Sequence, residues 1–204
     1  MSVSDVPSPI DLRDTSDAKA WERSAQARLG RASIFERFRR ELGSLRTRQP
    51  YILELGSGPG FLAEFLAKAL PNLRLALLDF SAAMHDLAQA RLREYSEVVE
   101  FIHGDFKDPN WIDRLGPFDA AVTNQSVHEL RHKQHAVVLH RQVRDILKPR
   151  APYLVADHFF GTGGMSDDQL YMTIAEHGEA LRAAGFVDVR LLVSSGSLVM
   201  YRAE

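Results

Sequence analysis

From residue 50 onward, short apolar runs alternate with segments in which apolar residues recur every three or four positions. The apolar runs are typical of buried strands, and the periodic segments are typical of amphipathic helices. The expected strands lie at residues 51–55, 73–78, 98–102, 118–124 and 152–157, and the expected helices at 61–70, 137–147 and 177–184. Because strands that alternate with helices form parallel sheets, we expect an α/β fold whose sheet is covered on both faces.

The two ends of the chain follow different patterns. Near the C-terminus, apolar runs at residues 186–193 and 198–201 flank the sequence SSGS, which is a turn signal and predicts a hairpin. Near the N-terminus, apolar residues between Trp21 and Leu42 recur at spacings of three and four, which predicts one or two helices packed on the core.

Charge is unevenly distributed, although the net charge is only −2. Between Lys19 and Arg48 there are nine basic residues and three acidic ones. This segment is typical of a solvated helix face or of an anion-binding or RNA-binding face. We favour the solvated face, because no glycine-rich or aromatic-interleaved basic tract accompanies the charges.

Composition restricts the class of protein. The chain has 204 residues, of which 45% are hydrophobic, and no cysteine, so disulfides and cysteine-ligated metals are excluded. The first 17 residues are polar and lack the apolar region of a signal peptide, and no apolar stretch is long enough to cross a membrane. We therefore expect a cytoplasmic protein without a membrane partner.

A glycine-rich loop follows the first expected strand, in the pattern E-x-G-x-G-x-G. Gly56, Gly58 and Gly60 stand at alternate positions before the first helix. A side chain at any of them would separate the backbone from a ligand or force the turn out of the positive-φ region. Glu54 places a carboxylate at the same strand end, where it suits an ammonium or sulfonium better than a phosphate. The spacing also differs from the G-x-G-x-x-G of dinucleotide-binding proteins.

Acidic residues also follow the next two strands. Asp79 ends the second strand, where a carboxylate can accept hydrogen bonds from both hydroxyls of a ribose. It opens the segment DFSAAM, in which Ser81 is expected to cap the next helix. Asp105 follows the third strand, and the fourth strand ends at Asn124.

In this order and spacing, these elements resemble the class I S-adenosylmethionine-dependent methyltransferases from about residue 50 to the C-terminus. The resemblance implies a doubly wound, Rossmann-like, seven-stranded mixed sheet of order 3-2-1-4-5-7-6, with the last strand antiparallel. It implies S-adenosylmethionine as cofactor, with Met84 and Phe106 beside the adenine and Asp105 on its amino group. The cofactor residues expected are Glu54, Gly56, Ser57, Gly58, Gly60, Asp79, Phe80, Met84, Asp105, Phe106, Asn124 and Gln125. The predicted domains are a flexible tail (1–17), a helical cap (18–48) and the cofactor-binding domain (49–204).

Methyl transfer from a sulfonium needs alignment more than a fixed catalytic motif. Where the acceptor must lose a proton, a base is needed, and His128 and Glu129 just past the fourth strand are the candidates. The histidines at residues 132, 135 and 140 are not expected to bind a metal, and no metal site is predicted. The lack of cysteine excludes methylation through a covalent cysteine adduct and radical chemistry on an iron-sulfur cluster.

The acceptor is expected to be a small molecule. Enzymes that methylate base amines or glutamine amides typically follow the strand-end Asn with Pro-Pro-Tyr, whereas Gln125, Ser126 and Val127 stand here. Two alternatives stay open. One is an RNA or protein methyltransferase that uses the basic N-terminal segment, so a nucleic-acid partner is disfavoured but still considered. The other is a protein that binds S-adenosylmethionine without catalysis. The sequence leaves the oligomeric state open.

Overall fold

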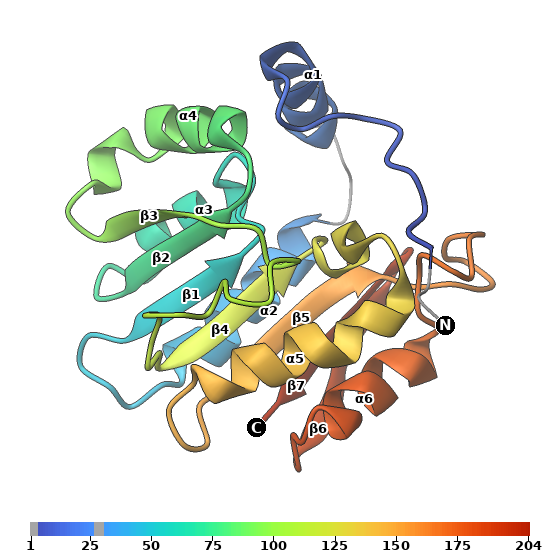
Figure 1. Cartoon of the computed structure of the whole chain (residues 1–204). Helices are drawn as coiled ribbons and strands as arrows, with labels where there is room; N and C mark the ends of the chain where they lie inside the picture. The colour runs from blue at the N-terminus through green and yellow to red at the C-terminus, as the bar shows by residue number, and fades with distance from the viewer. Residues whose placement is uncertain (1–3, 27–30) are drawn as a thin grey trace.

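A seven-stranded sheet forms the centre of the protein, which a computed structural model describes for residues 4–26 and 31–204 (Figure 1). The strand order is β3-β2-β1-β4-β5-β7-β6, and β7 runs antiparallel to both of its neighbours, as predicted. The strands are β1 Tyr51–Leu55, β2 Arg74–Asp79, β3 Val99–His103, β4 Ala120–Asn124, β5 Tyr153–His158, β6 Val189–Ser195 and β7 Leu198–Ala203. Because β1 to β5 are parallel, their carboxyl ends meet at one edge of the sheet.

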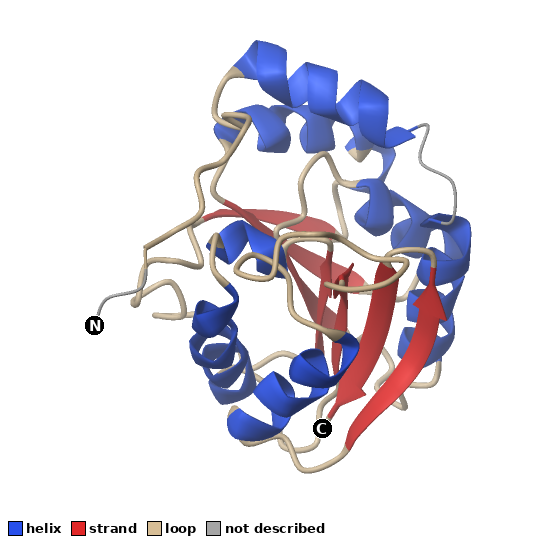
Figure 2. Cartoon of the chain, turned by 90° about the vertical axis from the view of Figure 1, so that its right-hand side faces the viewer, coloured by secondary structure: helices blue, strands red, loops and turns tan. Residues whose placement is uncertain are grey.

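Helices cover both faces of the sheet (Figures 1 and 2). One apolar layer joins α2, α3 and α4 to the sheet through side chains such as Phe38, Leu66 and Ala88. The opposite layer joins α5 and α6 through Leu139 and Leu181. The helices are α1 Thr15–Gln26, α2 Arg31–Gly43, α3 Phe61–Ala69, α4 Ala82–Arg91, α5 Ala136–Asp145 and α6 Ile174–Ala183, with short 3₁₀ turns η1 Arg93–Tyr95, η2 Val127–Leu130 and η3 Lys133–His135.

Local signals explain where two helices begin. The hydroxyl of Ser81 accepts a hydrogen bond from the Met84 N–H, so Ser81 caps α4 as expected. Helix α6 begins three residues before the predicted start at residue 177, because Thr173 and Glu176 form a reciprocal capping box. The predicted end of this helix before Gly185 is confirmed. Helix α6 ends at Ala183, and Gly185 adopts a positive φ just beyond it.

The N-terminal segment lies across the carboxyl edge of the sheet. Its residues 4–14 are bound to the domain, with the Val6 N–H donating to the Arg131 carbonyl at 2.8 Å. Helix α1 packs on α4 through Ala18, Ala83 and Met84. The division into tail, cap and domain stays a prediction, and residues 1–3 of the tail and 27–30 of the cap, with Arg28 and Leu29, lie outside the described residues. Among the described helices, none is long and apolar enough to span a membrane.

Candidate functional site

A cavity of about 500 Å³ opens where β1, β2, β4 and β5 end. Most of the residues predicted for the site line it, including both catalytic candidates. Those residues are Glu54, Gly56, Ser57, Gly58, Asp79, Phe80, Met84, Phe106, Asn124, Gln125, His128 and Glu129. Two predicted residues, Gly60 and Asp105, do not line it. Asp105 instead lines an adjoining cavity of about 360 Å³, together with Phe80 and Phe106.

The three loop glycines have different neighbours, although all adopt a positive φ. A Cβ at Gly56 would lie 2.4 Å from the Cβ of Ser126, and one at Gly60 would lie 3.0 Å from Leu92 on the turn after α4. A Cβ at Gly58 would meet no described atom within 4 Å, because this position faces the cavity. The positive φ at all three positions fits the predicted need for glycine in this turn, and the neighbours separate two further reasons for it. Gly56 and Gly60 allow close packing of the protein, and Gly58 presents its backbone to the cavity.

Asp79 holds the glycine loop in place. Its two carboxylate oxygens accept hydrogen bonds from the Gly58 N–H at 2.8 Å and the Ser81 N–H at 2.9 Å. Burial raises the pKa of Asp79, and these backbone hydrogen bonds act against that shift. A carboxylate has further lone pairs beyond the two used here, so the predicted contact with ribose hydroxyls remains compatible with this geometry.

Glu54 is a buried carboxylate, and one of its oxygens has no hydrogen-bond partner among the described residues. Its side chain lines the cavity, the residue is only 3% exposed, and the oxygen in question is Oε2. Burial, with the nearby charge of Asp79, raises the pKa of Glu54 to about 8. Because a buried polar atom without a partner is costly, this end of the cavity is suited to a cationic group from a ligand.

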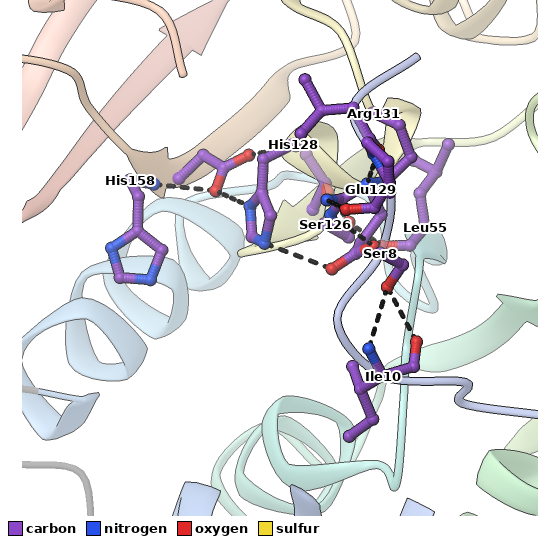
Figure 3. A network of polar contacts seen from close by, with 12 residues as sticks. Ser8, Ile10, Leu55, Ser126, His128, Glu129, Arg131 and His158 are labelled. Carbon is purple, nitrogen blue, oxygen red and sulfur yellow. Dashed lines mark hydrogen bonds and ion pairs between the residues drawn. The ribbon is translucent and has the colours of Figure 1, made fainter. Parts of the chain in front are cut away.

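The other end of the cavity holds an imidazole bound to a carboxylate (Figure 3). His128 lies on η2, and its Nδ1 is 2.6 Å from Oδ1 of Asp157 on β5. The backbone N–H groups of His128 and His158 donate to the same carboxylate, at 2.9 and 2.7 Å. Burial acts to lower the pKa of His128, but Asp157 and Glu129 outweigh it and raise that pKa to about 10. Burial likewise acts to raise the pKa of Asp157, and the His128 charge outweighs it and lowers that pKa to about 2.

Glu129 and Arg131 continue this network toward the N-terminal segment (Figure 3). Oε1 of Glu129 is 3.4 Å from Nε2 of His128, and its Oε2 is 3.4 Å from Nη1 of Arg131. The Arg131 guanidinium also donates to the carbonyls of Val6 and Pro7, at 3.0 and 2.8 Å. The segment that covers the cavity is therefore joined by polar contacts to the imidazole inside it.

Sequence reasoning missed Asp157 and Arg131 as site residues. Asp157 had a usable signal, because it is an acid near the carboxyl end of a parallel strand, as Glu54 and Asp79 are. Arg131 had none, since its backbone φ of 66° and its bonds to main-chain carbonyls depend on tertiary structure. Among residues 4–26 and 31–204, no group of three histidine or acidic side chains is arranged to bind a metal ion.

Residues 52–150 match the family of the methyltransferase domain. The chain contains a methyltransferase domain of the class I fold. This confirms the resemblance predicted from the glycine loop and the strand-end acids. The roles of individual residues in that domain stay predictions.

The chain covers between about a quarter and three fifths of the length of the similar proteins described next. A release factor glutamine methyltransferase from Chlorobaculum tepidum is 37% identical over 78 residues, which cover 37% of this chain and 26% of that protein. An O-methyltransferase family protein from Burkholderia thailandensis has a TM-score of 0.74 at 15% identity, over 95% of this chain and 60% of that one. Human N-acetylserotonin methyltransferase in complex with SAM has a TM-score of 0.68 at 17% identity, over 94% and 56%. The last two likenesses show the fold alone.

Proposed function

We propose that this protein transfers a methyl group from S-adenosylmethionine to a small-molecule acceptor. The observation that carries the proposal is the buried Glu54 carboxylate, whose Oε2 lacks a partner among the described residues, at the same end of the cavity as the open backbone of Gly58. An amino-acid ligand with an ammonium group would complete the surroundings of this carboxylate. These residues therefore fit the cofactor that the domain implies.

The cofactor supplies an electrophilic methyl group on a sulfonium, so the protein's main task is alignment. Glu54 would bind the cationic part of the amino-acid moiety. Because Gly58 has no side chain, the amino-acid moiety could approach the backbone there. Asp79 holds the loop through the Gly58 N–H and would accept hydrogen bonds from ribose hydroxyls. His128, which is paired with Asp157 on β5, lines the same cavity and would face the acceptor. Glu129 lines this cavity and also the adjoining one that contains Asp105.

The names of the similar proteins support a small-molecule acceptor in part. One of the similar structures is called an O-methyltransferase family protein, and another is named for N-acetylserotonin and holds SAM. The relative named for glutamine matches only 78 residues. In enzymes of that type, Pro-Pro-Tyr typically follows the Asn at the end of the fourth strand. In this chain Asn124 is followed by other residues, so we do not extend the glutamine acceptor to it. A cytoplasmic location stays a prediction from the sequence.

The basic segment is less suited to RNA than its composition suggests. Arg39 and Arg40 both pair with Glu36, at 2.6 and 3.2 Å, and Arg37 pairs with Glu41 at 2.8 Å. These three cations share two carboxylates, Glu36 and Glu41, so part of the basic charge of α2 is engaged within the protein. This favours the solvated helix face over an RNA-binding face, and the small-molecule acceptor is retained.

Isothermal titration with S-adenosylmethionine, S-adenosylhomocysteine and NAD tests the cofactor assignment. We expect the wild type to bind the first two and not NAD. The Glu54→Gln variant should lose about tenfold or more in affinity, because it removes the charge that would pair with the ammonium group. A tenfold loss corresponds to about 1.4 kcal/mol. Glu97→Gln changes an exposed glutamate and is the matched control. Absence of S-adenosylmethionine binding to folded wild type would overturn the proposal. Binding without methyl transfer across a broad acceptor panel would favour the non-catalytic alternative.

A further inference from the structure

We propose that the acceptor binds through an anionic group, which takes the place of the Glu129 carboxylate between His128 and Arg131. The group would be a carboxylate or an ionised acidic hydroxyl. This inference rests on the proposed function, because it assigns the second end of the same cavity. It concerns how the acceptor is held, and it identifies Glu129 as a counter-ion that the acceptor replaces.

The two carboxylates around His128 are held very differently. Asp157 accepts three hydrogen bonds of 2.6 to 2.9 Å, and its side chain is 2% exposed. Glu129 makes two longer contacts, each of 3.4 Å, and its side chain is 29% exposed. Asp157 is therefore a fixed part of the site, whereas Glu129 is held by fewer and longer contacts, so a better-placed anion can compete with it for His128 and Arg131.

Displacing Glu129 would leave two cationic groups facing the cavity. Nε2 of His128 and Nη1 of Arg131 both contact Glu129, and both residues line the cavity. Arg131 would stay in place, because its Nε and Nη2 donate to Val6 and Pro7. An anionic acceptor would restore the charge balance that Glu129 provides, and a neutral acceptor would not.

The surroundings strengthen the preference for an anion. Tyr171, with its ring 5.4 Å from that of His128, and the apolar side chains of Met165 and Leu170 also line the cavity. Ion pairs are stronger in such an apolar site than in water. The pKa of His128 is about 10, raised by Asp157 and Glu129 against the effect of burial, so the imidazole is cationic at neutral pH. A cationic imidazole binds an anion, so in this inference His128 holds the acceptor, and the base role of His128 stays a prediction.

Titration with small anions tests the inference on the free protein, so it does not depend on cofactor binding. The ring resonance of His128 would be identified in ¹³C-histidine-labelled protein by its loss in His128→Gln. Sodium acetate is then added at constant ionic strength, with neutral acetamide as the isosteric comparison. We expect acetate to shift the His128 resonance saturably and acetamide to leave it unchanged. If acetate and acetamide act alike, the inference is wrong.

The decisive variant is Glu129→Gln, which keeps the shape of the side chain and removes the competing charge. We expect its acetate dissociation constant to fall about tenfold relative to wild type. Glu179→Gln on the exposed face of α6 is the matched control and should leave the constant unchanged. Unchanged or weaker acetate binding in folded Glu129→Gln would overturn the inference. A comparison of benzoate with 4-nitrophenolate then assigns the site to carboxylates or to acidic hydroxyls, according to which binds more tightly.

The two proposals fail in different ways. Loss of S-adenosylmethionine binding with acetate binding intact would remove the proposed function and leave an anion site. Cofactor binding with no acetate effect would remove the anion site and leave the proposed function.

Discussion

The two ends of the cavity both contain buried carboxylates, but among the described residues only one end has a cationic side chain beside them. At one end, Glu54 and Asp79 lie close together, and burial raises the pKa of both groups. At the other end, Asp157 lies against the His128 imidazole, which outweighs burial and lowers the pKa of Asp157 to about 2. Glu54 and Asp79 would be paired with a cation only if a ligand supplied one, whereas Asp157 is already paired with the His128 imidazole.

This difference separates affinity from positioning. A carboxylate without a cationic partner costs stability in the free protein, and a ligand that supplies the cation recovers that cost on binding. A carboxylate paired within the protein contributes stability at all times and fixes the geometry of its partner. Glu54 therefore belongs to ligand recognition, and Asp157 belongs to the architecture that orients His128.

Breaking the internal pair should have the largest effect. Asp157→Asn removes the charge that faces His128 and weakens three hydrogen bonds, which should lower the free energy of unfolding by about 3–5 kcal/mol. Urea unfolding at pH 6 measures this loss, and Asp113→Asn at an exposed site is the control. A loss below the control's variation would show that the pair contributes little.

The pH dependence of this loss has a defined sign. His128 has a pKa raised from 6.5 to about 10, so its contribution is complete below pH 6.5 and is lost as the pH rises through about 10. Asp157 has a pKa lowered from 3.8 to about 2, so its contribution is present above pH 3.8 and is lost as the pH falls through about 2. The difference between wild type and Asp157→Asn should therefore be larger at pH 6 than at pH 10.

Removing the unpaired charge at the other end should have the opposite sign. Because the folded-state pKa of Glu54 is raised from 4.5 to about 8, wild-type stability should fall as the pH rises between these values. Glu54→Gln cannot ionise, so it should be more stable than wild type by about 2–4 kcal/mol at pH 9 and nearly equal at pH 5. Urea unfolding of the ligand-free protein at both values measures this, with Glu97→Gln as control. Equal stabilities at pH 9 would mean that Glu54 is already compensated.

Much of the cofactor end could be predicted from the sequence. Apolar runs and helical periodicity located the strands, and the glycine loop with Glu54 and Asp79 placed acids at successive strand ends. Parallel strands bring such residues together without further information, because their carboxyl ends share one edge. The different environments of Gly56, Gly58 and Gly60 could not be read from the sequence, since they depend on Ser126 and Leu92 from other segments.

The acceptor end was less accessible to sequence reasoning. His128 and Asp157 are 29 residues apart, and they meet because β4 and β5 are neighbouring strands and the backbone turns through a positive φ at Gln125 just after β4. Gln125 is not a glycine, so the sequence does not show that the chain turns here. The N-terminal segment contacts Arg131 through its own main-chain groups, and main-chain bonds leave no mark in the side-chain pattern.

The junction between the two ends should show the smallest effect, without charge dependence. The buried Ser126 hydroxyl donates to the Leu55 carbonyl at 2.9 Å and lies 2.5 Å from the Thr123 hydroxyl, so it ties the β4 end to the glycine loop. Ser126→Ala keeps the Cβ that packs on Gly56 and removes these hydrogen bonds, which should cost about 1 kcal/mol. A hydroxyl does not titrate in this range, so unfolding should show the same loss at pH 5 and pH 9, with Ser96→Ala as the exposed control. A loss that changed with pH would mean that the two ends are electrostatically coupled through Ser126, and the contrast between a ligand-dependent end and a self-paired end would have to be abandoned.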